Sequence, residues 1–153
     1  MAGDDNRSHP VIGWREWMSF PELAIGHIKA KIDTGARTSA LHAFYVEPFH
    51  EDGVAMVRFG IHPLQKRMDI ALECAAPVLD QRIITDSGGH PEMRYVIETP
   101  VTLGNITWPI QVTLTNRDNM RFRMLLGRTA LQDRFLIAPS RSYLLGKKPP
   151  RKT

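Results

Sequence analysis

Cysteine is nearly absent from this sequence, with Cys74 alone among the 153 residues. A single cysteine cannot form an intrachain disulfide, and it cannot build a thiolate metal site on its own. Cys74 lies in the apolar run at residues 70–76. We therefore interpret it as a buried structural thiol, with a nucleophilic cysteine as the alternative.

Long apolar runs are also missing. No stretch approaches the roughly 20 residues that a membrane-spanning helix needs. Residues 1–10 are polar and contain Asp4 and Asp5, where a signal peptide would have a basic segment and then an apolar one. The length suits one globular domain. These features predict a soluble, cytoplasmic protein without a membrane partner.

Motifs for metal and nucleotide binding are missing as well. Zinc needs three or four converging ligands, and the six histidines show no His-Glu-x-x-His spacing or comparable cluster. We interpret His42 as a structural histidine, with a metal ligand as the alternative. No Gly-x-x-x-x-Gly-Lys-Ser/Thr loop is present for ATP. The sequence therefore predicts no metal and no cofactor.

The excess of positive charge is confined to one end of the chain. The formal net charge is +4, and residues 147–153 carry four basic residues; without them the chain has 16 basic and 16 acidic residues. We predict a disordered N-terminus at residues 1–10, one domain at 11–146 and a disordered basic tail at 147–153. Any contact with nucleic acid is expected to involve that tail.

Short segments that are rich in β-branched or alternating residues lie between scattered glycines and prolines, which is typical of an all-β protein. The predicted strands are residues 11–14, 27–33, 54–61, 68–74, 81–85, 94–103, 106–116 and 135–139. Gly104-Asn105 is expected to form a tight hairpin turn. One short helix is predicted at residues 128–134.

The strand at residues 27–33 leads directly into Asp33-Thr34-Gly35. This triplet is weak evidence by itself, because an Asp-Thr-Gly turn is a good way to end a strand. Its context favours catalysis. A half-buried alternating strand precedes it, Ala36 and a Ser/Thr-rich loop follow it, and Leu125-Leu126-Gly127-Arg128 opens a short helix much later in the chain.

These segments carry a resemblance to retropepsins, whose paired motifs are an apolar strand ending in Asp-Thr-Gly-Ala and a Gly-Arg helix. Together with Gly13-Trp14-Arg15-Glu16, they resemble more narrowly a bacterial and archaeal family of retropepsin-like proteins. Members were long labelled ATP-dependent zinc proteases, and some are encoded beside the ATP-grasp ligase that adds glutamates to a small-subunit ribosomal protein. The resemblance covers about residues 11–146.

The resemblance implies a closed β-barrel of the acid-protease type and a homodimeric aspartic peptidase. Such enzymes hold two carboxylates about 3 Å apart that share one proton. One carboxylate activates water, and the protonated one stabilises the oxyanion. Because this chain has one triplet, a second subunit must supply the other aspartate. Asp33 would be catalytic, Thr34 would brace the dyad, and Gly35 would let the substrate backbone approach.

Other positions follow from the same mapping. Ala36, Arg37 and Thr38 would contact substrate, and Gly127 with Arg128 would support the site. The loop Ser87-Gly88-Gly89 is a candidate flap over the substrate, with an ordinary surface hairpin as the alternative.

Arg37 departs from the viral pattern, in which an acidic residue pairs with the arginine that Arg128 represents here. Two arginines near one cleft repel each other unless an anion lies between them, such as an acidic substrate, Asp133 or Glu98. The link to glutamylation suggests the glutamate-rich tail of a ribosomal protein as substrate, with Arg37 and Arg94 binding its carboxylates. The alternative is that these arginines have internal structural partners.

Two other functions are alternatives to peptide hydrolysis. A zinc hydrolase, suggested by the family's old label, lacks a recognisable ligand set and is rejected. A catalytically silent barrel that binds peptides or a partner protein stays open. The intact Asp-Thr-Gly argues against it, because a pure binding module has no need of a carboxylate at a dimer centre.

Overall fold

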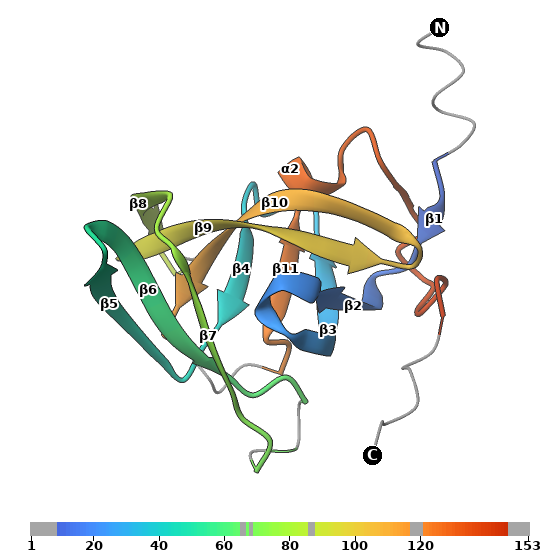
Figure 1. Ribbon diagram of the computed structural model, residues 1–153. Coiled ribbons are helices and arrows are strands. Elements are labelled where there is room, and N and C mark those ends of the chain that lie inside the picture. The colour runs from blue at the N-terminus through green and yellow to red at the C-terminus, as the bar shows by residue number, and fades with distance from the viewer. Residues whose placement is uncertain (1–8, 65–66, 68, 86–87, 117–120, 147–153) are drawn as a thin grey trace, which may run out of the picture.

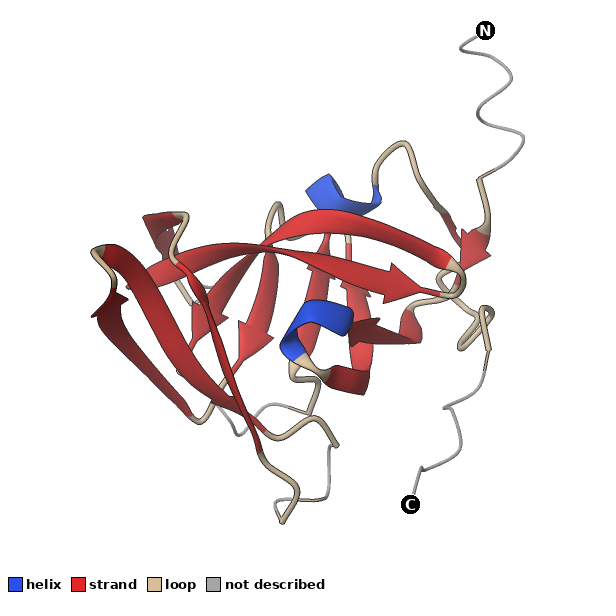
Figure 2. Cartoon of the chain, in the orientation of Figure 1, coloured by secondary structure: helices blue, strands red, loops and turns tan. Residues whose placement is uncertain are grey.

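The computed structural model describes residues 9–64, 67, 69–85, 88–116 and 121–146, and strands dominate this part of the chain (Figure 2). The predicted termini at 1–8 and 147–153, and Ser87, lie outside the described residues. The strands are β1 (Val11–Ile12), β2 (Arg15–Phe20), β3 (Ile25–Asp33), β4 (Ser39–His42), β5 (Tyr45–Glu51), β6 (Val54–Ile61), β7 (Leu72–Pro77), β8 (Asp80–Thr85), β9 (Pro91–Leu103), β10 (Ile106–Thr115), β11 (Met124–Gly127) and β12 (Leu136–Ile137). A 3-10 helix, η2 (Pro21–Leu23), and the α-helix α2 (Arg128–Leu131) complete the fold.

A closed ring of strands forms the body of the molecule. Within the described residues the strand order is β10-β4-β11-β3-β2-β9, and β9 pairs again with β10, so the ring has no open edge. The long β9–β10 hairpin crosses the molecule above the other strands (Figure 1). The prediction of an all-β barrel with one short α-helix is confirmed.

Two groups of strands lie outside the ring. Strand β8 pairs with the outer part of β9, and β5, β6 and β7 form a separate three-stranded sheet at one side of the barrel (Figure 1). Apolar side chains of the ring and of this small sheet share one hydrophobic core, to which Phe20, Ile28, Phe59, Leu103 and Leu126 contribute. Burial of such side chains is the main favourable term in folding.

The β9–β10 turn matches the sequence-based prediction. Gly104 has a φ of +64°, a conformation that glycine adopts without steric cost, and Ile106 pairs with Leu103 across the turn. Helix α2 ends at Leu131 and is therefore shorter than the helix predicted at residues 128–134. Strand β7 begins at Leu72, later than the predicted start at 68.

Four strands, β2, β4, β5 and β11, are not among those that the sequence predicts. The expected strand at 11–14 is interrupted at Gly13, where an added Cβ would lie 2.1 Å from the Arg141 carbonyl oxygen, and β2 begins at Arg15. Residues 39–42, expected to be loop, form β4. All four are buried, so they lack the alternating pattern of a half-buried strand. Strand β5 is largely exposed and also shows no apolar alternation.

Glu16 ties the carboxyl-terminal segment to the barrel. Its side chain is fully buried, and Oε2 accepts hydrogen bonds from the backbone N–H groups of Gly13 (2.7 Å) and Leu144 (2.9 Å). Oε1 accepts a third from the N–H of Leu145 (3.2 Å). A buried carboxylate is costly unless hydrogen bonds replace its water, so these three donors make its position possible.

Cys74 lies in β7 with 5% of its surface exposed, and its Sγ donates to the Leu23 carbonyl oxygen at 3.5 Å. Burial, assisted by the charge of Glu73, raises the pKa of the Cys74 thiol to about 11. The interpretation as a buried structural thiol is confirmed. No helix in the described part of the chain is long and apolar enough to cross a membrane.

Replacing Glu16 by Ala should lower the free energy of unfolding by about 3 kcal/mol, since three backbone donors lose their acceptor. Urea denaturation measures this loss. The matched control is Glu22→Ala, which removes an exposed carboxylate and should change stability by less than about 0.5 kcal/mol. Equal stability of the two variants would contradict the role assigned to Glu16.

The native chain should react with iodoacetamide at pH 8 on the order of 100-fold more slowly than a free cysteine, because only the thiolate reacts. Mass spectrometry of the intact protein over time measures the rate, and the chain unfolded in guanidinium provides the comparison. The folded thiol holds its proton more tightly than the unfolded one. This contribution to stability is therefore complete below about pH 9 and is lost as the pH rises through about 11. Rapid labelling of the native chain would contradict this assignment.

Candidate active site

Asp33 closes the turn that follows β3. Its Oδ1 accepts hydrogen bonds from the backbone N–H groups of Gly35 (3.1 Å) and Ala36 (3.2 Å), and its carbonyl oxygen accepts a further bond from Ala36 (3.2 Å). These contacts fix the direction of the half-buried carboxylate. Among the described residues Oδ2 has no hydrogen-bond partner, which leaves it available to water, substrate or a second carboxylate.

The loop at residues 33–38 lies on the start of α2. Strand β11 runs parallel to β3 with Gly127 opposite Asp33. The backbone N–H of Arg128 donates to the Ala36 carbonyl oxygen (2.9 Å). Thr129 donates to the Arg37 carbonyl oxygen from its N–H (3.2 Å) and from Oγ1 (2.8 Å). The first residues of α2 therefore supply the hydrogen-bond donors that hold the loop against the helix.

Gly127 permits this close approach because it has no side chain. A Cβ at this position would lie 2.7 Å from the Thr38 carbonyl carbon, 2.8 Å from the Thr38 oxygen and 3.0 Å from the Ala36 oxygen. These are backbone atoms that cannot rotate away. The N–H of Gly127 also donates to Ser39 Oγ at 3.0 Å.

The Arg128 guanidinium binds the tip of the loop. Nη1 lies 3.3 Å from the Thr34 carbonyl oxygen and 3.4 Å from that of Gly35. The sequence assigned Gly127 and Arg128 to the support of the site, and the structure brings both against the Asp33 loop. Backbone carbonyl oxygens are thus the partners of the Arg128 guanidinium among the described residues, in place of the acidic side chain of the viral pattern.

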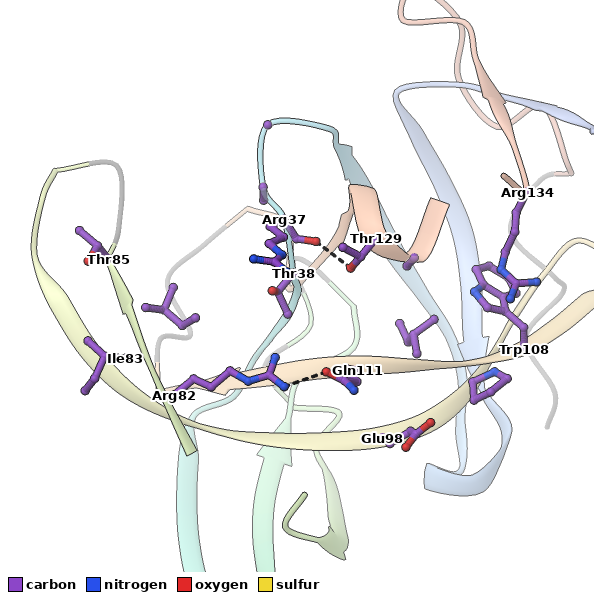
Figure 3. Close-up of a pocket in the computed structure, with 16 residues that line it drawn as sticks. Arg37, Thr38, Arg82, Ile83, Thr85, Glu98, Trp108, Gln111, Thr129 and Arg134 are labelled. Carbon is purple, nitrogen blue, oxygen red and sulfur yellow. Dashed lines mark hydrogen bonds between the residues drawn. The ribbon is translucent and has the colours of Figure 1, made fainter. Parts of the chain in front are cut away.

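A cleft of about 1020 Å³ opens beside this loop. One side consists of residues 35–38 together with Thr129 and Ala130 of α2. Figure 3 shows Arg37, Thr38 and Thr129 on this side, across from Arg82 and Gln111. The predicted substrate-binding residues Ala36, Arg37 and Thr38 therefore line a real concavity.

Strands complete the cleft. Residues 82–85 of β8, Glu98 of β9 and residues 108–111 of β10 line it, and Arg134 lies at one end. The predicted flap residues Gly88 and Gly89 are exposed in the connection between β8 and β9 and do not line the cleft. The strand that precedes them, β8, lines it instead.

Arg94 is not brought to the cleft. It is buried in β9, where Nε lies 2.7 Å from Glu92 Oε1 and Nη1 lies 3.5 Å from Thr113 Oγ1. A guanidinium held in this way is committed to the interior. This geometry agrees with the alternative of an internal structural partner.

The arginines that line the cleft differ in whether an acidic side chain lies beside them. Arg82 donates to Asp80 Oδ2 (3.0 Å) and to Gln111 Oε1 (3.0 Å), and its hydrogen bond holds the pKa of Asp80 below the ordinary value. Within the described chain, Arg37 and Arg134 have no acidic partner.

The predicted internal acids do not neutralise these positions. Neither Asp133 nor Glu98 pairs with Arg37 or Arg128 among the described residues. Among the described residues, three guanidinium groups and one carboxylate line the cleft, which therefore favours anionic ligands.

Residues that could hold a metal do not gather in the described chain, where no group of three or more His, Cys, Asp or Glu side chains is suitably placed. His42 lies in β4 and is 4% exposed, which agrees with its interpretation as a structural residue.

Sequence reasoning missed Arg82, Trp108, Gln111 and Arg134 as lining residues. A usable signal was present only for Trp108. It occupies an inward position in the alternation with Ile110 and Val112, and an indole in a core needs a partner for its N–H.

Replacing Gly127 by Ala should displace the Asp33 loop, because the new Cβ meets fixed backbone atoms. We expect a loss of about 2 kcal/mol in unfolding free energy and faster amide hydrogen exchange at Arg128 and Thr129. Gly26→Ala is the matched control, since a Cβ there meets nothing within 4 Å. Unchanged exchange in the Gly127 variant would refute the close-contact argument.

Proteins with similar sequences are known from bacteria. The chain is 46% identical over 138 residues to a protein from Shewanella pealeana and 48% identical over 137 residues to one from Desulfotalea psychrophila, both named "Probable alpha-L-glutamate ligase". Each match covers 90% of this chain and 30% of the relative, so the chain spans under a third of the length of these proteins.

A solved structure shares the fold. It is a Legionella pneumophila protein described as having unknown function, with a TM-score of 0.75 and 24% identity, and the match covers 90% of this chain and 99% of that one. The family model described as "Retropepsin-like aspartic endopeptidase RimB" matches residues 11–148. The chain therefore belongs to the RimB-like family of retropepsin-like aspartic endopeptidases.

Proposed function

We propose that this chain is an aspartic endopeptidase that acts as a homodimer on glutamate-rich peptide tails. The observation that carries the proposal is the Asp33 carboxylate. It stands on a loop docked against Gly127 and Arg128, beside a cleft, with Oδ2 unengaged by described residues. Family membership supports the reaction class.

In the proposed dimer, Asp33 of each subunit supplies one carboxylate. Two carboxylates held close together share a proton, because like charges at that distance cannot both ionise. The ionised carboxylate takes a proton from water, which attacks the scissile carbonyl, and the protonated carboxyl hydrogen-bonds the developing oxyanion. The exposed Thr34 would brace the partner's loop, and the exposed Gly35 leaves room for substrate backbone.

Strand β8 would guide the substrate. It ends the strand order next to β9, so one of its edges has no strand partner among the described residues. Residues 82–85 of this strand line the cleft. An extended peptide can pair with such an edge through its backbone. The β8–β9 hairpin thereby takes the flap role that the sequence assigned to Ser87, Gly88 and Gly89.

Two observations support an acidic substrate. Arg37 lines the cleft without an acidic partner among described residues, so a substrate carboxylate can supply its counter-charge. The relatives from Shewanella and Desulfotalea are named as glutamate ligases and contain a segment similar to this chain. A peptidase joined to such a ligase would meet its glutamylated product. The sequence resemblance suggests the tail of a ribosomal protein, which would place the reaction in the cytoplasm.

Asp33→Asn should reduce hydrolysis of an α-linked oligoglutamate peptide by roughly 10³-fold or more, because the variant loses the group that accepts a proton from water. Mass spectrometry of the products measures the rate, and analytical ultracentrifugation should show that the variant keeps the oligomeric state of the wild type. Asp52→Asn is the matched control. Asp52 is exposed in a turn with a φ of +51°, which asparagine tolerates, so activity should not change.

Three outcomes would contradict the proposal. Undiminished hydrolysis by Asp33→Asn would place the catalytic group elsewhere. Binding of acidic peptides without any hydrolysis by the wild type would instead indicate a silent peptide-binding barrel. Complete inhibition by a metal chelator would indicate a metal-dependent hydrolase.

A further inference from the structure

The end of the cleft at Trp108 has an unusual construction. The Trp108 ring packs against Phe135, with ring centroids 5.4 Å apart at an interplanar angle of 50°. The Arg134 guanidinium carbon lies 5.5 Å from the Trp108 ring centroid. Figure 3 shows Arg134 and Trp108 side by side at one end of the cleft, away from Ile83 and Thr85. Contacts with both neighbours hold the indole in one orientation.

The backbone after α2 produces this arrangement. Asp133 adopts a φ of +65°, and the N–H groups of Arg134 and Phe135 both donate to the Leu131 carbonyl oxygen at 3.1 Å. This tight turn sends the Phe135 side chain into the core, where 6% of it is exposed, and leaves Arg134 at the cleft.

The Trp108 side chain carries a buried donor that lacks an acceptor. Trp108 is 4% exposed, and its Nε1 has no hydrogen-bond partner among the described residues. Buried N–H groups almost always have a partner, and an unpaired one costs roughly 1–3 kcal/mol. Because Trp108 lines the cleft, a ligand there can supply the acceptor.

Arg134 adds a cationic donor at the same point. The residue is exposed, and within the described chain its guanidinium contacts the Trp108 ring rather than an acid. Rotation of this long side chain would uncover the part of the Trp108 ring that the guanidinium now covers and would keep the guanidinium within reach of the same ligand group. A planar guanidinium fork beside a single N–H suits a carboxylate, which has two oxygens and accepts only.

We propose that Trp108 and Arg134 form a subsite that binds a side-chain carboxylate of the peptide substrate. Arg37 and Arg82 line the same cleft, and Arg82 is already bonded to Asp80. Glu98 is the one acidic residue among the lining side chains, so the positive charge exceeds the negative. The subsite rests on the proposed function, because a peptide is taken to occupy the cleft.

Binding of hexaglutamate and hexaglutamine to the full chain tests the subsite. Isothermal titration calorimetry on the Asp33→Asn background separates binding from hydrolysis. Arg134→Gln should weaken hexaglutamate binding by roughly 10- to 100-fold, as expected for loss of a hydrogen bond to a charged group, and should leave hexaglutamine binding unchanged. Arg134→Lys should fall between the two, because an ammonium keeps the charge but not the fork.

A second variant tests the indole directly. Trp108→Phe keeps an aromatic ring beside Phe135 and removes the N–H, and it should weaken hexaglutamate binding about tenfold. In the Asp33→Asn background with Trp108 and Arg134 intact, the Trp108 indole N–H resonance should shift downfield on addition of hexaglutamate. Circular dichroism establishes that each variant is folded.

The matched control is Arg121→Gln. It removes a guanidinium that lies 5.9 Å from the Phe122 ring centroid, an arrangement similar to that of Arg134 but outside the lining of the cleft. Hexaglutamate binding should not change in this variant. If Arg121→Gln and Arg134→Gln lose the same amount of hexaglutamate affinity, the effect is due to the net charge of the chain. This result would overturn the subsite.

Other outcomes separate this proposal from the peptidase assignment. If the wild type hydrolyses oligoglutamate and Arg134→Gln binds it normally, the subsite is wrong and the proposed function stands. If no hydrolysis occurs but binding depends on Arg134 and Trp108, the subsite stands and the peptidase proposal fails. Absence of saturable hexaglutamate binding to the Asp33→Asn chain with Trp108 and Arg134 intact would also overturn the subsite.

Discussion

The contact between the Asp33 loop and the backbone at Gly127 is the constraint on which the rest of the site depends. At this point the chain approaches itself so closely that a single Cβ would meet the carbonyl groups of Thr38 and Ala36. Because the contact forms, β3 and β11 run side by side with Asp33 opposite Gly127, and α2 begins beneath the loop. The cleft opens on the other side of the same loop, so one contact positions both the Asp33 carboxylate and this wall of the cleft.

Arginine performs different tasks at chemically similar positions in this protein. Arg128 binds the carbonyl groups of the loop tip, and Arg94 is committed to Glu92 inside β9. Arg82 shares its charge with Asp80 at the cleft. Arg37 and Arg134 also line the cleft, and neither has an acid beside it in the described chain. A guanidinium without a counter-charge attracts anions far more strongly than one already paired, so these last two dominate the character of the cleft.

The sequence predicted the fold best where one face of a strand is buried. The alternation in β3, with Ile28 and Ile32 buried and Lys31 exposed, correctly indicated a strand that leads into Asp33. The pattern failed for β4, because its four residues are all buried between neighbouring strands and show no alternation. It failed also at Gly13, where the approach of the Arg141 carbonyl, distant in sequence, interrupts the strand predicted at residues 11–14.

By itself, the sequence determined the chemistry that is available: an Asp-Thr-Gly turn after an apolar strand, and a Gly-Arg pair that matches it. Both are short patterns of neighbouring residues, so they can be recognised without the three-dimensional structure. Only the tertiary structure decided which other side chains face the cleft. It buried Arg94 beside Glu92 and brought Arg134, from the turn after α2, onto the ring of Trp108 in β10. Contacts between segments far apart in the chain leave no periodic trace in the sequence, because they arise from barrel closure and not from local backbone preference.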